Sequence, residues 1–185
     1  GHRGRITRAA TGRRHQPRMT QGFYPVEAVS EIAPNIHVLT LRAPELARSV
    51  RAGQFLNIRT RDHFLPLLRR PFSVYDIDGD RLQIVFNVVG LGTRILASGA
   101  TGGPLDIIGP LGNAFGVAGD HEEALLVAGG LGIAPMPLLT AELKKTWKPI
   151  RTYLGARNGS QIVPQHLENV SVATDDGSAG HHGTV

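Results

Sequence analysis

The sequence of 185 residues contains no cysteine, and aromatic residues make up only 5% of it. The absence of cysteine excludes disulfide bonds within these residues, and it excludes thiolate ligands for zinc or for an iron–sulfur cluster. No apolar run approaches the roughly 18 residues that a membrane-spanning helix needs, and the N-terminus lacks the apolar core of a signal peptide. We therefore expect a cytoplasmic protein with no membrane association.

Positive charge is concentrated at the N-terminus. Six of the 20 Lys and Arg residues, and none of the 15 Asp and Glu residues, lie within residues 1–18. The rest of the chain carries 14 basic and 15 acidic side chains, so the net charge of +5 belongs to this tail. We expect residues 1–18 to be a leader or a disordered extension, with Met19 as the native start. The alternative is a nucleic-acid-binding barrel with a basic tail, against which the low aromatic content argues.

The first half of the remaining chain has the pattern of an all-β unit. Six short segments show strand composition or alternate with period two, and turn residues separate them. They are residues 24–29, 36–42, 52–59, 67–76, 81–89 and 105–108. This spacing predicts a six-stranded antiparallel β-barrel over residues 19–118.

The pattern changes after a Gly- and Pro-rich segment, residues 109–115, which predicts a turn and a linker. Residues 124–128 form a continuous apolar run, typical of a strand buried on both faces. A glycine-rich turn, a helix to about Lys145 and two more strands, residues 151–156 and 170–174, follow. The order of strand, helix and strand predicts an α/β domain with a parallel sheet over residues 119–185.

The segment Arg70-Pro71-Phe72-Ser73 is the strongest candidate for chemistry in the barrel. Pro71 fixes its own φ and pushes Arg70 toward an extended conformation, which sets the separation between Arg70 and Ser73. A guanidinium group suits bidentate binding of a phosphate, and a hydroxyl group suits the edge of a ring or a sugar. An ordinary edge strand with a solvated arginine pair explains this short motif equally well.

A first glycine-rich turn follows the fifth expected strand and leads into a short helical stretch. It contains Gly90, Gly92 and Thr93. The free N–H groups and the positive dipole of a helix N-terminus favour a pyrophosphate. A crossover helix with a glycine-rich lead-in is the alternative.

A second turn, Gly-Gly-x-Gly-x-Ala-Pro, contains Gly129, Gly130 and Gly132. It differs from the dinucleotide fingerprint G-x-G-x-x-G, but its backbone would approach a pyrophosphate in the same way. Asp175 and Asp176 follow a predicted strand, at the edge where α/β sheets bind ligands, although a solvated loop explains them as well. The adjacent pair His181 and His182 has a poor chelating spacing, so we predict no metal site.

The order of these motifs resembles the ferredoxin–NADP reductase superfamily. Within it, residues 22–185 most resemble the electron-transfer subunits of class 1B dihydroorotate dehydrogenases. The motifs that carry this resemblance are residues 69–76, 109–115, 127–138 and 173–178.

The resemblance implies FAD in the barrel and NAD on the parallel sheet. Arg70 would hold the FAD phosphates, Ser73 would touch the isoalloxazine, and Asp175 and Asp176 would lie near the nicotinamide side. The implied cofactor-binding residues are Arg70, Pro71, Phe72, Ser73, Val88, Gly90, Gly92 and Thr93 for FAD, and Gly129, Gly130, Gly132, Asp175 and Asp176 for NAD.

The resemblance also implies a partner and a path for electrons in pyrimidine biosynthesis. An FMN-containing dihydroorotate dehydrogenase catalytic subunit, in a heterotetramer of two plus two, would pass electrons through a 2Fe–2S cluster and FAD to NAD. No catalytic acid or base is needed on this chain. The sequence departs from the family in having no cysteine for the cluster, so we expect that the C-terminal iron–sulfur segment is missing. Subunits of sulfide dehydrogenase or of NADH-dependent ferredoxin–NADP oxidoreductase share these motifs and are the alternative.

Overall fold

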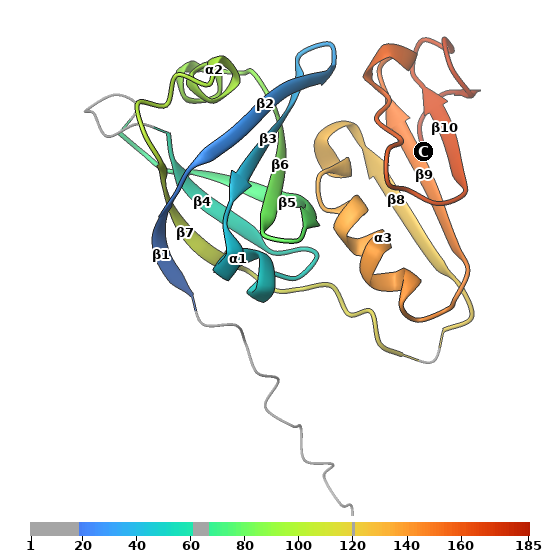
Figure 1. The fold of residues 1–185 in the computed structure, drawn as a ribbon. Helices are drawn as coiled ribbons and strands as arrows, with labels where there is room; N and C mark the ends of the chain where they lie inside the picture. Colours follow the sequence, from blue (N-terminus) through green and yellow to red (C-terminus); the bar gives the residue numbers. More distant parts are fainter. Residues whose placement is uncertain (1–18, 61–66, 120) are drawn as a thin grey trace, which may run out of the picture.

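The computed structural model describes residues 19–60, 67–119 and 121–185, so the predicted basic tail lies outside the described residues. Two sheets follow one another along the chain (Figure 1). The first sheet, called the curled sheet, contains β1 (Thr20–Tyr24), β2 (Val26–Ala33), β3 (Ile36–Arg42), β4 (Phe55–Arg59), β5 (Arg70–Asp78), β6 (Arg81–Asn87) and β7 (Leu105–Leu111). Two helices accompany it, α1 (Pro44–Ser49) and α2 (Leu91–Ser98).

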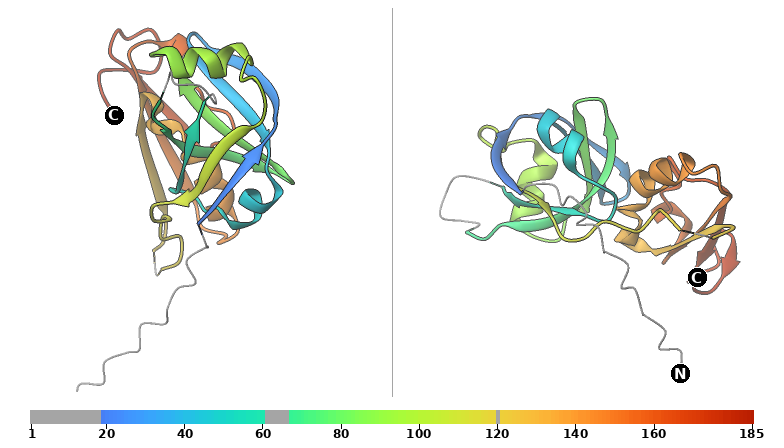
Figure 2. Two further views of the ribbon diagram at one scale, coloured as in Figure 1. Left: turned by 90° about the vertical axis from the view of Figure 1, so that its left-hand side faces the viewer. Right: turned by 90° about the horizontal axis from the view of Figure 1, so that it is seen from below.

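The curled sheet is antiparallel, as predicted, but it has seven strands in the order β1-β7-β4-β5-β6-β3-β2. The prediction of six strands was wrong because Pro25, which has no N–H group, divides the expected first strand. Tyr24 ends β1, which pairs with β7, and Val26 begins β2, which pairs with β3. The two edge strands are therefore consecutive in sequence, and the sheet curls into a half-barrel (Figure 2).

One local prediction in this half was also wrong. The expected strand 105–108 continues as β7 through Gly109 and Pro110 to Leu111, where a turn was predicted. A Cβ atom at Gly109 would lie 2.5 Å from Leu56 Cδ2, so glycine serves here for close packing against β4. Pro44 follows the expected strand 36–42 and occupies the first turn of α1, where its missing N–H costs nothing.

The second sheet, called the parallel sheet, contains β8 (Ala124–Gly129), β9 (Ile150–Ala156), β10 (Val170–Thr174) and the short β11 (His181–His182). All its pairings are parallel, in the order β11-β10-β9-β8, which confirms a parallel sheet. The 3-10 turn η1 (Gly130–Ile133) and the helix α3 (Met136–Lys144) connect β8 to β9, and η2 (Gly159–Gln161) follows β9. The pair His181–His182, for which the sequence predicted no strand, forms β11.

The parallel sheet buries one face only. Leu126 and Ala128 face α3 and are buried, whereas Leu125 and Val127 point to the other face and are 61% and 57% exposed. The prediction that residues 124–128 are buried on both faces was therefore wrong for the described residues. After α3 the chain turns at Trp147, the single tryptophan, which has a positive φ of 60° and is 94% exposed.

The two halves pack side by side, with α3 against β5 (Figures 1 and 2). Leu138, Leu139 and Leu143 of α3 belong to the same buried cluster as the core of the curled sheet. A second apolar cluster joins Tyr75 and Val85 of the curled sheet to Ala134 and Val163 of the other half. No helix within residues 19–60, 67–119 and 121–185 is long and apolar enough to cross a membrane.

Candidate functional site

The N-terminus of α2 is shaped by Thr93. Its hydroxyl oxygen accepts hydrogen bonds from the N–H groups of Val89, at 2.9 Å, and Gly90, at 3.1 Å. Gly90 is the extended residue before the helix, so Thr93 fixes the loop that enters α2. The N–H groups of the first helical turn have no partner within the helix and remain available to an anion.

Arg70, at the start of β5, lies directly against this turn. A Cβ atom built at Gly92 would be 2.6 Å from Arg70 Nε and 3.0 Å from its Cζ. A guanidinium nitrogen, Nη1, also donates to the carbonyl oxygen of Leu68. The structure thus brings together two segments that were singled out separately in the sequence, a half-buried guanidinium group and a helix N-terminus.

The residues that follow Arg70 on β5 differ in burial and in their contacts. Pro71 is exposed, and Ser73 is half-buried and pairs with Phe55 of β4. Phe72 is buried in the core, where its ring meets the edge of Phe86 with centroids 5.9 Å apart. Val88, which directly follows β6, is half-buried, and its carbonyl oxygen accepts a hydrogen bond from Asn35.

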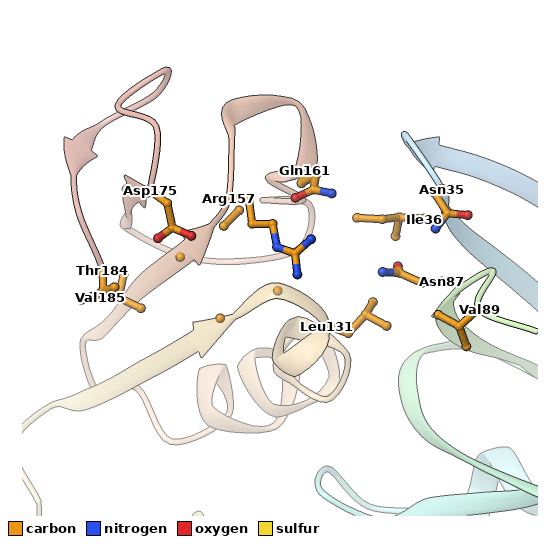
Figure 3. Close-up of a pocket in the computed structure, with 14 residues that line it drawn as sticks. Asn35, Ile36, Asn87, Val89, Leu131, Arg157, Gln161, Asp175, Thr184 and Val185 are labelled. Carbon is orange, nitrogen blue, oxygen red and sulfur yellow. The ribbon is translucent and has the colours of Figure 1, made fainter.

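A cleft of about 610 Å³ lies between the curled sheet and the carboxyl ends of the parallel strands (Figure 3). This edge is where α/β sheets bind their ligands. Asn35, Ile36, Asn87 and Val89 line the cleft from the curled sheet, and Gly129, Gly130, Leu131, Gly155, Ala156, Arg157, Gln161, Asp175, Thr184 and Val185 line it from the other half. Val89, which lines the cleft, directly precedes Gly90, so the loop that enters α2 begins at the cleft.

The glycine turn after β8 presents a bare backbone. A Cβ atom at Gly129, Gly130 or Gly132 would meet nothing within 4 Å, and Gly130 has a φ of +53°, which favours glycine. Gly129 and Gly130 line the cleft, whereas Gly132 does not. This turn therefore leaves room for a bulky group to approach its N–H groups.

The structure separates the two carboxylates that the sequence placed together. Asp175 lines the cleft. The carboxylate of Asp176 instead accepts hydrogen bonds from the hydroxyl of Ser178, at 2.6 Å, and from its N–H, at 2.9 Å. These bonds from Ser178 lower the pKa of Asp176. Asp176 thus closes a turn, and Asp175 is the carboxylate that lines the cleft.

Sequence reasoning missed several polar residues of the cleft, and two of them, Arg157 and Asn87, have side chains with unsatisfied polar groups in the part of the chain that the structure describes. Arg157 directly follows β9 and extends its guanidinium group into the cleft, where no carboxylate of the described residues pairs with it (Figure 3). Asn87 ends β6, and its Oδ1 is buried without a hydrogen-bond partner among the described residues. The signal for Arg157 was present, because the rule that drew attention to the carboxyl end of β10 applies equally to β9.

No protein-family model matches the chain, but curated proteins do. The dihydroorotate dehydrogenase B (NAD(+)) electron transfer subunit of Desulforamulus reducens is 38% identical over 167 residues, 86% of this chain and 64% of the relative. The same subunit of Bacillus velezensis is 33% identical over 175 residues, 90% of this chain and 68% of the relative. The chain thus spans about two thirds of the length of these relatives.

Solved structures show the same fold. The NADH-dependent reduced ferredoxin–NADP oxidoreductase superimposes with a TM-score of 0.75 at 30% identity, over 88% of this chain and 60% of that one. Phthalate dioxygenase reductase superimposes with a TM-score of 0.65 at 18% identity, over 86% of this chain and 52% of that one. The curled sheet, the parallel sheet and the cleft between them define a reductase fold of the ferredoxin–NADP reductase type. Within that class, the chain belongs to the family of dihydroorotate dehydrogenase B electron transfer subunits.

Proposed function

We propose that this chain is an oxidoreductase subunit that passes electrons from a dihydroorotate-oxidising FMN subunit, through FAD, to NAD. The observation that carries the proposal is the contact of the Arg70 guanidinium group with Gly92 in the first turn of α2. A cation and a helix N-terminus that meet in this way make a site for a diphosphate. In this proposal residues 19–118 bind FAD and residues 119–185 bind NAD.

The residues around α2 fit FAD. Arg70 would pair with its phosphates, and the first-turn N–H groups at Gly92 and Thr93 would donate to the pyrophosphate. Pro71, Phe72, Ser73, Val88 and Gly90 would line the flavin, with the Ser73 hydroxyl at the isoalloxazine. When bound, FAD supplies the redox chemistry, because it accepts electrons singly and passes a hydride to NAD.

The cleft fits the second nucleotide. The open backbone of Gly129, Gly130 and Gly132 would approach the NAD pyrophosphate, because a side chain there would fill the space that the phosphates need. Asp175 and Asp176 would lie near the nicotinamide side, with Asp175 facing the cleft. The chain's own residues bind and orient, and none of them has to move a proton.

The names of the relatives support the proposal that the partner is a catalytic subunit. An electron transfer subunit of dihydroorotate dehydrogenase B works with a catalytic subunit, and we propose a heterotetramer of two such subunits and two FMN-containing ones. A 2Fe–2S cluster would relay electrons between the two flavins. These 185 residues contain no cysteine to hold it, so on their own they would not link the flavins.

The test is flavin binding and its reduction by NADH. Purified protein mixed with FAD should become yellow with one flavin per chain, and NADH should bleach it. Arg70→Ala should weaken FAD binding by roughly 2–3 kcal/mol, or about 30- to 150-fold, since a charge-assisted contact to phosphate is lost. Arg48→Ala, which removes an exposed arginine paired with Asp80, is the matched control. Flavin retention by Arg70→Ala equal to that of the control would rule out the site.

One alternative has a specific observation in its favour. The structure that superimposes with a TM-score of 0.75 is an NADH-dependent reduced ferredoxin–NADP oxidoreductase, studied for flavin-based electron bifurcation. The partner decides between the two functions. Co-purification with an FMN-bearing dihydroorotate dehydrogenase supports our proposal, and co-purification with a larger iron–sulfur flavoprotein supports the alternative.

A further inference from the structure

We infer that Glu142 and Arg51 form a clamp that sets the orientation of the parallel-sheet half against the curled-sheet half, and that Glu142 is therefore a positioning residue. This inference rests on the proposed function for its catalytic consequence, but the clamp is a feature of the chain alone. It is defined as the Glu142 carboxylate, the Arg51 guanidinium group and the Ala52 N–H.

The clamp uses both carboxylate oxygens of Glu142, a residue that is only 9% exposed. Glu142 Oε1 accepts hydrogen bonds from Arg51 Nε, at 2.9 Å, and from the N–H of Ala52, at 3.1 Å. Glu142 Oε2 accepts a third from Arg51 Nη2, at 3.2 Å. A bidentate pair of this kind fixes direction as well as distance, which apolar contacts between the halves do not.

The curled-sheet end of the clamp is held rigidly. The Arg51 N–H donates to Gln54 Oε1 at 2.9 Å, and Gln54 Nε2 donates to the carbonyl oxygen of Gly112. The carbonyl oxygen of Ala52 accepts a bond from the N–H of Phe115, in the segment that connects the two sheets. The clamp therefore lies where the connecting segment leaves the curled sheet.

The clamp joins two segments that are connected to the proposed cofactor sites. Glu142 belongs to α3, the helix that follows the glycine turn of the cleft. Arg51 and Ala52 precede β4, which pairs with the Arg70 strand β5. A change in the angle between the halves would move the glycine turn relative to Arg70, and a displacement near 1 Å can slow a reaction by about 100-fold.

Removal of Arg51 would leave the buried Glu142 carboxylate without its counterpart, whereas removal of the Glu142 charge leaves Arg51 half-exposed and free to turn into solvent. Glu142→Gln keeps an oxygen for the Ala52 N–H but loses the charge and one bond to Arg51. We expect this variant to bind FAD and NADH within about twofold of the unchanged protein and to reduce its flavin at least tenfold more slowly. A residue needed only for folding would instead lower flavin content and affinity together.

The orientation can be measured without any cofactor. Because the chain has no cysteine, spin labels attach only at introduced sites, and Ser98→Cys and Ser171→Cys place one exposed label on each half. Pulsed dipolar spectroscopy should give a narrow distance distribution for the doubly labelled protein and a broader or displaced one after Glu142→Gln. Arg51→Ala, which changes the more exposed partner of the pair, should broaden it in the same way if Glu142→Gln fails to fold.

Lys144→Ala is the matched control, because Lys144 lies on the same helix and pairs with Glu168 within the parallel-sheet half. It should leave both the distance distribution and the flavin reduction rate unchanged. Unchanged distances and rates after both clamp substitutions would overturn the inference, as would an equal effect of Lys144→Ala. If the unchanged protein takes up no FAD, the proposed function fails, and the distance measurement still decides whether the clamp exists.

Discussion

The Arg70 guanidinium group packs on the bare backbone of Gly92, so closely that a methyl group there would lie 2.6 Å from Nε. Real Cβ atoms do not approach nitrogen to that distance, because the two atoms would overlap. Glycine at this position is therefore a condition for Arg70 to reach the first turn of α2. The contact joins a strand and a helix that are separated in sequence by β6.

A methyl group at Gly92 should displace Arg70 and weaken FAD binding. We expect Gly92→Ala to reduce FAD affinity by about 1–3 kcal/mol, since the charge-assisted contact to phosphate is strained or lost. Gly116→Ala is the control, because a Cβ atom there meets nothing within 4 Å. Flavin titration of both variants measures the effect, and equal affinities would contradict the role of Gly92.

Stability at acid pH should depend on Asp106. Burial would raise its pKa, but hydrogen bonds from Arg69 and Gln21 outweigh burial and hold the pKa below its usual range. A lowered folded-state pKa contributes stability above the unfolded value of about 3.9, and that stability is lost as the pH falls through the folded pKa. Asp106→Asn should lose about 1–3 kcal/mol at pH 7 and show a weaker acid dependence in urea unfolding. Parallel acid profiles for the two proteins would disprove this.

Stability at alkaline pH should depend on Tyr75, which lies in the apolar cluster between the two halves. Burial, with a smaller contribution from the charge of Asp76, raises the pKa of Tyr75 to about 12. An unfolded tyrosine ionises near pH 10, so the unfolded chain releases its proton first and stability falls as the pH rises from about 10 to 12. Tyr75→Phe should remove up to about 2–3 kcal/mol of this fall. Denaturant unfolding at pH 9 and at pH 11.5 compares the two proteins, and identical losses would count against the assignment.

Substitution by alanine should destabilise the fold by different amounts at two glycines that have similar backbone conformations. Gly99 and Gly180 have φ values of +68° and +64°, but a Cβ atom at Gly99 meets nothing, whereas one at Gly180 would lie 2.0 Å from the carbonyl oxygen of Val172. Gly99→Ala should cost about 1–2 kcal/mol, the price of the left-handed conformation. Gly180→Ala should cost about 3 kcal/mol or more, because it adds a clash with β10. Urea unfolding gives both values, and similar losses would show that β10 yields to the methyl group.

The sequence predicted the order of the two sheets because period-two alternation and a continuous apolar run are local signals. The strand boundaries were predicted wrongly where a proline can either interrupt a strand or lie within one. Pro25 separates β1 from β2 inside a segment that alternates like one strand, and Pro110 lies inside β7 although proline usually marks a turn. Whether a proline interrupts a strand or is accommodated within it depends on the strands that pair with it, and those strands are distant in sequence.

The candidate site likewise has a part that the sequence predicted and a part that depends on tertiary packing. Motifs made of consecutive residues, such as the Arg70 segment and the glycine turn after β8, were visible in the sequence. The contact between Arg70 and Gly92 and the cleft position of Asn87 depend on how β5, β6 and α2 pack, so no local pattern reveals them. The separation of Asp175 from Asp176 depends on a hydroxyl group two residues further on, which a charge pattern does not contain.

Trp147 determines how unfolding of this protein has to be observed. With 94% of its surface in water in the native fold, its indole emission should already lie at the long wavelength of a solvated tryptophan. Denaturation should therefore shift the emission wavelength very little. The fluorescence signal would stay nearly constant through an unfolding transition that circular dichroism records in full. An aqueous quencher should reach the ring equally well before and after the chain unfolds.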